Sequence, residues 1–445
     1  MVDMSPELVT IVMFGAAIIG ILLGYPLALV LGGVAMFVGV AVIGEPVFII
    51  FRLRILGFLS EYIMLAVPMF VFMGVMVERS GAAERLYNGL YLWCGGLRGG
   101  LAIGSVLMGT ILAACVGVIA ASVIMIALIA VPSMLQRGYN KELVCGSVCA
   151  GGALGILIPP SIMLVIYGPM AQISVGKLFM AAFVPGFVLS GLYLSYIAIL
   201  CWLKPQLAPP IPAEERAVPL LKKLYILLTS MAPPIFLILA VLGSIFFGIA
   251  APTEAAAVGA LAAALLAIAY RRLNWQSIKE SALSTMKITC MVFLIGLGAS
   301  MFVGVFLRLG GGEAVTSLVL ATPGGKWGAF ALIMFLIFIL GMFIDWLGIL
   351  FIMIPIVTPI GADLGFDPLW FALMICVNLQ MSFLTPPFAY AIFYLKGISK
   401  PEWGITTAHI IRGVIPFVIL IMVGLSLCIA FPDIILWLPH QMIKF

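Results

Sequence analysis

Residues 151–161 read GGALGILIPPS and lie inside an apolar segment that runs from about Leu143 to Gly168. The pair Pro159-Pro160 cannot continue an α-helix, because neither residue has an N–H and each ring clashes with a carbonyl one turn back. The segment is therefore predicted to be a membrane-spanning helix that is broken near its middle. In lipid, such a break is tolerated only where the freed backbone groups face protein, a cavity or an ion.

A second break of the same kind occurs later in the chain. Residues 378–387 read NLQMSFLTPP and lie in the apolar segment 369–395, so that Pro386-Pro387 repeats the first proline pair at an offset of 227 residues. The same offset relates four other pairs of residues, which indicates an internal repeat: Pro132 and Pro359, Gly138 and Gly365, Tyr139 and Phe366, Asn140 and Asp367. Paired broken segments in corresponding positions are typical of the binding site of a secondary transporter.

The composition excludes several classes of protein. Hydrophobic residues make up 64% of the 445 residues and charged residues 9%, whereas charged residues form about a quarter of a soluble domain. The chain is therefore expected to be a polytopic membrane protein. The net charge of +5 needs no nucleic-acid partner, because basic loops on one membrane face account for it. The sequence shows no phosphate loop, zinc pattern or nucleophile–base signature, which argues against an ATPase, an enzyme and an organic cofactor.

Two apolar runs are too long for a single membrane crossing, which takes about 20 residues. Residues 101–135 and 328–361 are therefore predicted to be re-entrant hairpins of two half-length helices, and one tilted helix is the alternative for 101–135. The chain is expected to be an all-α polytopic protein with two inverted repeats. The first repeat is residues 1–203, with hairpin 101–135 and broken helix 143–168; residues 204–223 are a polar linker; and the second is 224–445, with hairpin 328–361 and broken helix 369–395.

Basic residues set two further expectations. Residues 46–60 are predicted to be a helix at the membrane interface, because Arg52 and Arg54 interrupt its apolar background. Residues 271–287 are predicted to be a basic interfacial arm that precedes a span over 288–307. The positive-inside rule then assigns 16 of the 22 basic residues to the cytoplasmic side and both termini to the outside.

Asp345 is the sharpest single candidate for a functional residue. It lies near the middle of the second predicted hairpin, with apolar residues on both sides. A carboxylate at bilayer depth costs about 2.5–3.5 kcal/mol on insertion scales, so it is a functional hypothesis by default. The alternative is a structural role as the cap of the second half-helix of the hairpin.

Polar residues also surround the two breaks. Asn378, Gln380, Ser382 and Thr385 flank the second break, and Gly151, Gly152, Gly155 and Ser161 form the matching set at the first. Hydroxyl, amide and unwound backbone oxygens suit a hard cation, and half-helix N-termini suit a carboxylate. The alternative is that these residues only satisfy the backbone of the breaks. Ser161, Asn378 and Gln380 are the candidates for contacts with the substrate.

Several motifs together resemble the large membrane subunit of the tripartite ATP-independent periplasmic (TRAP) transporters, the DctM-like family, and within it the branch labelled mannitol/chloroaromatic-type. They cover nearly the whole chain: LRGGLAI at 97–103, RGY at 137–139, GILIPPS at 155–161, APTEAAA at 251–257 and LTPPF at 384–388. The resemblance implies an elevator-type fold like that of the ion-transporter superfamily, in a multi-pass protein of the bacterial inner (plasma) membrane. It also implies sodium-coupled import of an organic acid.

The resemblance implies partners and ion ligands as well. The partners are a small four-helix membrane subunit, a periplasmic substrate-binding protein and membrane lipids. Sodium, the coupling ion and the only metal expected, would bind at the hairpin tips and helix breaks: Gly117, Ser122, Gly151, Gly155, Gly341, Asp345, Ser382 and Thr385. The first tip reads VGVIAAS at 116–122 and has one hydroxyl, where many members are rich in Gly and Ser. Backbone carbonyls would then do more of the ligation, and the substrate is expected to be less polar than a sialic acid or a C4-dicarboxylate.

Two other functions remain open at this point. One is a stand-alone carboxylate/sodium symporter of the same fold that needs no binding protein. The other is a structural membrane subunit of a respiratory-type complex, for which paired intramembrane histidines or charged relays would be expected.

Overall fold

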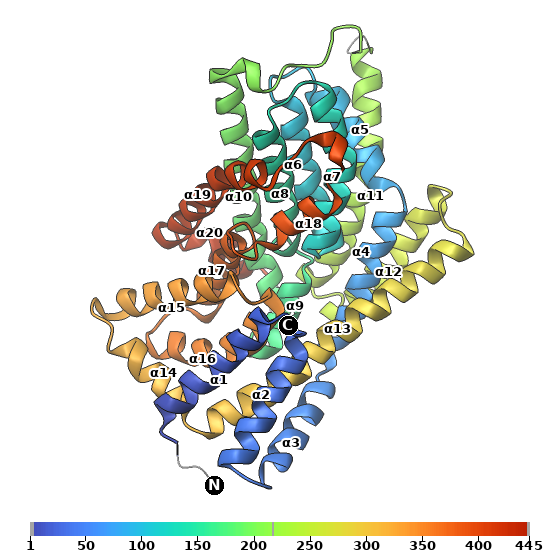
Figure 1. The fold of residues 1–445 in the computed structure, drawn as a ribbon. Coiled ribbons are helices and arrows are strands. Elements are labelled where there is room, and N and C mark those ends of the chain that lie inside the picture. Colours follow the sequence, from blue (N-terminus) through green and yellow to red (C-terminus); the bar gives the residue numbers. More distant parts are fainter. Residues whose placement is uncertain (1–3, 216–217, 443–445) are drawn as a thin grey trace.

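The computed structural model describes residues 4–215 and 218–442, and these fold into helices and connecting loops without a strand. The predicted all-helical membrane fold is therefore confirmed. Among the described residues, eight helical segments are long and apolar enough to cross a membrane. The chain order is shown in Figure 1: α1 Pro6–Leu22, α2 Leu27–Val42, α3 Val47–Leu59, α4 Ala66–Arg79, α5 Ala82–Cys94, α6 Gly100–Val116, α7 Ile119–Gln136, α8 Lys141–Ala153, α9 Ile162–Ala171, α10 Val175–Leu203, α11 Leu220–Phe246, α12 Pro252–Ala269, α13 Trp275–Arg308, α14 Gly311–Leu320, α15 Gly325–Gly341, α16 Trp346–Asp363, α17 Pro368–Ser382, α18 Tyr390–Ile398, α19 Thr407–Ala430 and α20 Asp433–His440.

Two helical hairpins stand where the long apolar runs predicted them. In the first, α6 ends at Val116, Gly117 takes a left-handed φ of +66°, and α7 begins at Ile119. Glycine adopts this conformation without the steric cost that a side chain would add. The chain reverses here, which excludes the single tilted helix. In the second hairpin, a tip of four residues, 342–345, joins α15 to α16.

The two broken helices are equally clear. α8 passes through a short 3₁₀ turn at Leu154–Ile156, and the chain is then non-helical until α9 begins at Ile162. α17 ends at Ser382 and α18 begins at Tyr390. Each proline pair lies inside its interruption, as expected for residues that lack an N–H.

Local structure repeats with the same offset as the sequence. α7 and α16 are both 18 residues long, and their bounds are related by 227 positions. Gly138 and Gly365 both have a φ of +74°. The residues that follow cap equivalent helices: Asn140 accepts hydrogen bonds from two backbone amides of α8 at 2.9 and 3.2 Å, and Asp367 accepts two from α17 at 2.9 Å each. The division into two repeats around a linker at 204–223 stays a prediction.

Three sequence expectations about single segments need correction or detail. Residues 275–287 of the expected basic arm and the expected span 288–307 lie in one continuous helix, α13, because basic residues do not interrupt a helix and the first proline or glycine after Trp275 comes only at Gly296. Its 34 residues extend about 51 Å at 1.5 Å each. The polar linker is shorter than expected, since α11 begins at Leu220. The expected interfacial helix is α3, which packs against α2 and α13.

The helices form two groups that meet near the hairpin tips. α13 packs against α2, α3 and α4, and α12 and α11 extend this layer to α5. In the second group, α8 packs against α6, α7 and α19, while α17 packs against α15, α16 and α19. Contacts of α13 with α16 and of α4 with α6 and α9 join the two groups.

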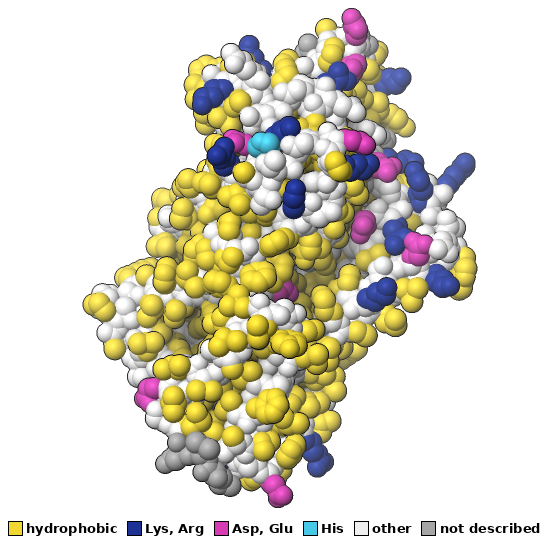
Figure 2. Space-filling view, viewed as in Figure 1, with side chains coloured by type: hydrophobic (Ala, Val, Ile, Leu, Met, Phe, Trp, Pro, Cys, Tyr) yellow, Lys and Arg dark blue, Asp and Glu magenta, His cyan; other side chains and the backbone are white. Residues whose placement is uncertain are grey.

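Charge is distributed unevenly over the surface. Most of the basic side chains visible in Figure 2 lie in the upper part and along the right edge, around α5 and the corner between α12 and α13, and few lie near the N-terminal end. This agrees with the side that the positive-inside rule assigns to the cytoplasm, and the orientation itself stays a prediction. Arg216 and Lys444, which that rule assigns to opposite sides, lie outside the described residues.

One close backbone approach holds the first hairpin against the first broken helix. A Cβ on Gly109 of α6 would lie 2.5 Å from the carbonyl oxygen of Gly151 in α8. We expect Gly109→Ala to lower the unfolding temperature of the purified protein by several degrees, because overpacking costs about 1–3 kcal/mol. Gly33→Ala in α2 is the control, since no atom lies within 4 Å of that Cβ position. Equal unfolding temperatures for the two variants, measured by scanning fluorimetry, would contradict this packing.

The connection between α10 and α11 is tied to the foot of the first hairpin. The Glu215 carboxylate accepts hydrogen bonds of 2.6 Å from the Tyr91 hydroxyl and the Arg137 guanidinium, and both lower the pKa of Glu215. Because folding lowers that pKa, the stabilisation from these two hydrogen bonds is complete above the ordinary carboxylate pKa. It is lost as the pH falls through the lowered pKa of Glu215.

We therefore expect Glu215→Gln to speed limited proteolysis of this connection about two- to fivefold at neutral pH, which is the scale of an exposed ion pair. Glu214→Gln is the matched control, because Glu214 forms none of the ion pairs or side-chain hydrogen bonds found among the described residues. The difference between Glu215→Gln and the unchanged protein should shrink as the pH falls below about 4. A difference that persists there would argue against the ionised carboxylate as the tie.

Candidate functional site

The tip of the first hairpin lies directly against the first helix break. A Cβ on Gly117 would lie 3.6 Å from the carbonyl oxygen of Pro160 and 3.6 Å from the amide nitrogen of Ile162, the first residue of α9. A Cβ on Gly155 would lie 2.7 Å from the Ser122 hydroxyl oxygen. These glycines therefore let backbone and hydroxyl groups of the tip and the break approach closely, without side chains between them.

Two hydroxyls at this first site differ in their partners. Ser122 is buried, and its Oγ has no hydrogen-bond partner among the described residues. Ser161 is also buried, but its hydroxyl donates to the carbonyl of Ile156 across the break. Ser122 Oγ thus has no partner of its own, whereas the Ser161 hydroxyl helps to satisfy the break and keeps its lone pairs.

The second hairpin tip meets the second break in the same way. The backbone amide of Phe388 donates to the Met342 carbonyl at 3.1 Å, which joins the break to the tip. The Ser382 hydroxyl donates to Phe338 of α15 at 3.2 Å and lies against the position of a Cβ on Gly341. The Thr385 hydroxyl donates to the Met381 carbonyl at 2.8 Å. Their oxygens retain lone pairs, because a hydroxyl that donates can still accept or ligate.

The residues expected to contact substrate lie deeper than expected. The side-chain amide of Asn378 donates to the Met334 carbonyl in α15 at 2.8 Å, so it holds hairpin and broken helix together. Gln380 is fully buried, and both its amide oxygen and nitrogen lack a partner among the described atoms. In the described part of the chain, neither of these residues, nor Ser161, lines the cavity at the hairpin tips or the two cavities that flank it.

Asp345, by contrast, faces a cavity between the two halves of the protein. This tip cavity has a volume of about 160 Å³ and is lined by both hairpin tips, both second half-helices and α13: Val118, Ile119, Ala120, Ile162, Ile288, Met291, Val292, Asp345, Trp346, Leu347, Tyr390 and Tyr394. Asp345 is half-buried at the N-cap position of α16, near the amides of Trp346 and Leu347, but makes no capping hydrogen bond. Its carboxylate therefore remains available to a ligand.

The chemistry of the tip cavity favours a cation. Its polar side chains are the Asp345 carboxylate, the phenols of Tyr390 and Tyr394 and the indole of Trp346, and of the residues that the structure describes, no lysine or arginine lines it. Oxygen ligands of this kind suit a hard cation. Sequence reasoning missed Tyr390 and Tyr394, although their spacing of four residues, immediately after a break, predicts that both lie on one face of α18.

Two further cavities are larger than the tip cavity. An inner cavity of about 250 Å³ shares Val118, Ala120 and Ile288 with the tip cavity and extends to Glu78, Arg79 and Ser284. The outer cavity, of about 760 Å³, shares no lining residue with the tip cavity. α3, the C-terminal half of α13, α16 and the end of α9 line the outer cavity, and its polar side chains are Arg54, Glu61, Gln172, Ser300 and Thr358.

The chain is similar to known transporter proteins in both sequence and fold. It is 32% identical to the C4-dicarboxylate TRAP transporter large permease protein DctM of Pseudomonas aeruginosa, over 86% of this chain and 87% of that protein. It is 31% identical to the ectoine/5-hydroxyectoine TRAP transporter large permease protein UehC of Ruegeria pomeroyi, over 84% and 85%. The YdaH transporter of Alcanivorax borkumensis matches in fold with a TM-score of 0.61 at 15% identity, over 88% and 89%.

The family match covers almost the whole chain. The model described as "Tripartite ATP-independent periplasmic transporter, DctM component" matches residues 10–434. Together with the eight candidate spans, this makes the chain a multi-pass protein of the inner membrane and a transporter subunit, not an enzyme. The chain belongs to the tripartite ATP-independent periplasmic transporter family, as its DctM component, the large membrane subunit.

Proposed function

We propose that this chain imports an organic acid or a related small solute by sodium-coupled, elevator-type alternating access. The solute would be delivered by a periplasmic substrate-binding protein, and the chain would act together with a small four-helix membrane subunit. The observation that carries the proposal is the tip cavity, where Asp345 faces Tyr390, Tyr394 and the first hairpin tip. The coarser statement, a secondary transporter subunit for organic solutes, follows from the family.

Electrostatics support the coupling of ion and solute. An organic anion that entered the tip cavity alone would meet the Asp345 carboxylate, and none of the described residues that line this cavity is basic and could offset its charge. Two like charges held in the same small cavity repel each other strongly where the dielectric constant is low. A sodium ion at Asp345 would remove that repulsion, so that anion and cation bind more tightly together than apart. Ser122, Ser382 and Thr385 supply further oxygens close to the two tips.

The arrangement of cavities supports alternating access. The tip cavity joins the inner cavity through shared lining residues and has none in common with the outer cavity. A solute at the tips would thus be exposed toward the side with Glu78 and Arg79, which the charge distribution predicts to be cytoplasmic. Movement of α6–α9 and α15–α18 along α13 would expose the same tips to the outer cavity, which is the motion that inverted repeats make possible.

One of the two alternative functions is excluded, and the other is left to experiment. A structural subunit of a respiratory-type complex is wrong, because the chain belongs to a transporter family. A stand-alone carboxylate/sodium symporter has the same site but needs no binding protein, and uptake measurements separate it from the proposed system.

Uptake into proteoliposomes tests the proposed system. The vesicles would hold this chain and the small membrane subunit, with purified binding protein loaded with radiolabelled organic acids outside. We expect uptake to require both an inward sodium gradient and the binding protein. Uptake that continues after the sodium gradient is collapsed would contradict sodium coupling, and uptake of free acid without the binding protein would favour the stand-alone symporter.

Asp345→Asn tests the proposed ion site in the same assay. Because the substitution removes the charge at nearly constant shape, we expect sodium-driven uptake to fall at least tenfold and its dependence on sodium concentration to be lost. Asp363→Asn, at the exposed end of the same helix, is the matched control and should transport normally. Wild-type sodium dependence in Asp345→Asn would rule out this carboxylate as a sodium ligand.

A further inference from the structure

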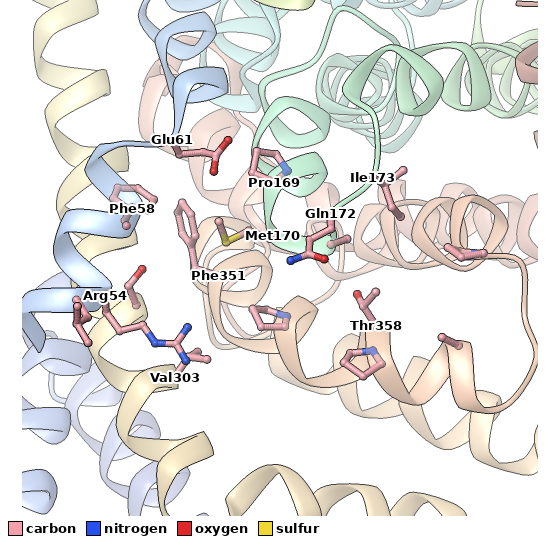
Figure 3. Close-up of a pocket in the computed structure, with 18 residues that line it drawn as sticks. Arg54, Phe58, Glu61, Pro169, Met170, Gln172, Ile173, Val303, Phe351 and Thr358 are labelled. Atoms are coloured by element: carbon pink, nitrogen blue, oxygen red, sulfur yellow. The ribbon is translucent and has the colours of Figure 1, made fainter. Parts of the chain in front are cut away.

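The outer cavity is larger than the tip cavity and lies apart from both hairpin tips. Residues from four elements distant in sequence line it: α3, the C-terminal half of α13, the C-terminal end of α9, and α16. Figure 3 shows its side chains converging on one space, with Arg54 and Phe58 from α3 on one side and Gln172 and Thr358 on the other.

Arg54 brings an unengaged positive charge into this cavity. Its guanidinium forms none of the ion pairs or side-chain hydrogen bonds found among the described residues. Its stem lies on Gly304 of α13, where a Cβ would come within 3.0 Å of Arg54 Cγ and 3.2 Å of Nε. The missing side chain of Gly304 thus makes room for Arg54, and the planar guanidinium is well suited to a carboxylate.

Two residues with neutral polar side chains line the same cavity. Thr358 Oγ is buried and has no hydrogen-bond partner in the described part of the chain. Gln172, whose amide points toward the cavity in Figure 3, has a left-handed φ of +56° and ψ of +38° at the end of α9. This conformation is costly for a residue other than glycine, and such strain is found at ligand sites.

Glu61 limits what the cavity can hold. It lines the same space and does not lie within ion-pair distance of Arg54, and Figure 3 shows it beyond Phe58 on the same side of the cavity as Arg54. A ligand with a carboxylate at Arg54 would therefore have its other end near Gln172, Thr358 or Glu61. Hydrogen-bond donors fit there, and a second carboxylate would be repelled by Glu61.

We propose that the outer cavity is a binding site for a solute with one carboxylate and an otherwise uncharged, hydrogen-bonding body, held by Arg54. This inference rests on the proposed function, since it makes the cavity the site that the solute occupies before the hairpin tips become exposed to the outside. It also specifies the substrate class: a monocarboxylate rather than a dicarboxylate.

Thiol labelling measures the electrostatic field and ligand binding in this cavity without requiring transport. The full chain and its small subunit would be placed in phosphatidylcholine nanodiscs, in a Cys290→Ser background, because Cys290 is the exposed cysteine and the other seven are buried. Ser300→Cys is the reporter: Ser300 lines the cavity one helical turn before Gly304. The readout is the ratio of reaction rates with an anionic and a cationic methanethiosulfonate of similar size.

Arg54→Gln should lower this ratio about five- to tenfold, because a unit charge at the distance of one helical turn attracts one reagent and repels the other. Arg52→Gln is the matched control: it removes an equal charge from the same helix at a position that does not line the cavity, and it should change the ratio less than about twofold. Equal effects of the two substitutions would overturn the assignment of Arg54.

Ligand binding is tested with lactate and with lactamide, its neutral amide, at equal ionic strength. We expect lactate to slow labelling at least twofold and lactamide to have little effect, with the protection lost in Arg54→Gln. Equal protection by both compounds, or by neither, would overturn the carboxylate site. Labelling that is slower in phosphatidylglycerol nanodiscs than in phosphatidylcholine nanodiscs, and that lactate does not slow, would assign the cavity to a lipid head group. That result would overturn the solute site.

A second reporter keeps the test independent of one variant. Ala362→Cys, on the opposite wall in α16, should give the same ordering of rates if Ser300→Cys does not fold. Because labelling needs neither a sodium gradient nor a binding protein, a positive result stands even if the uptake experiments contradict the proposed transport. A negative result with intact sodium-coupled uptake would remove this site and leave the proposed function in place.

Discussion

A helix that breaks inside a membrane must have its freed backbone groups satisfied by protein, and this constraint organises the structure. Each hairpin tip lies against a break: Gly117 beside Pro160 and Ile162, and Met342 accepting a hydrogen bond from Phe388. Hairpin and broken helix therefore form one unit, because each hairpin tip supplies contacts that its break would otherwise lack. The close approach of Gly109 to Gly151 extends the same contact along the helices.

Charge is divided between two separate spaces in the molecule. Asp345 faces the tip cavity, which has no basic residue among its described lining, whereas Arg54 faces the outer cavity. A cation and an anion would therefore be attracted to different places, and in the proposed function a solute anion reaches the tips only together with a cation. Coupling of this kind needs no contact between ion and solute in the outer cavity. Its free energy would come from the cation that neutralises the Asp345 carboxylate in the tip cavity.

Sequence patterns predicted features with a local physical cause and failed where the cause was distant. The proline pairs and Gly117 act within one turn of the backbone, so the breaks and the first hairpin could be placed to within a few residues. The expected boundary at residue 287 between the basic arm and the span was wrong because charge does not end a helix: Asn274 caps α13, which continues from Trp275 to Arg308. That the amide of Asn378 donates to Met334, a residue 44 positions earlier in the chain, could not be read from the sequence, and its expected contact with substrate stays a prediction.

By itself, the sequence determined that this is a membrane protein with two interrupted helices and an internal repeat, because hydropathy and the chemistry of proline and glycine act over short distances. Only the tertiary structure decided which polar groups remain available. Among the described residues, Ser122 Oγ has no hydrogen-bond partner and Asp345 makes no capping hydrogen bond, whereas Ser161 and the amide nitrogen of Asn378 donate to backbone carbonyls. The tip cavity and the outer cavity were likewise invisible in the sequence, since their walls join residues as far apart as Val118 and Tyr394, or Arg54 and Thr358, and such walls arise from long-range packing alone.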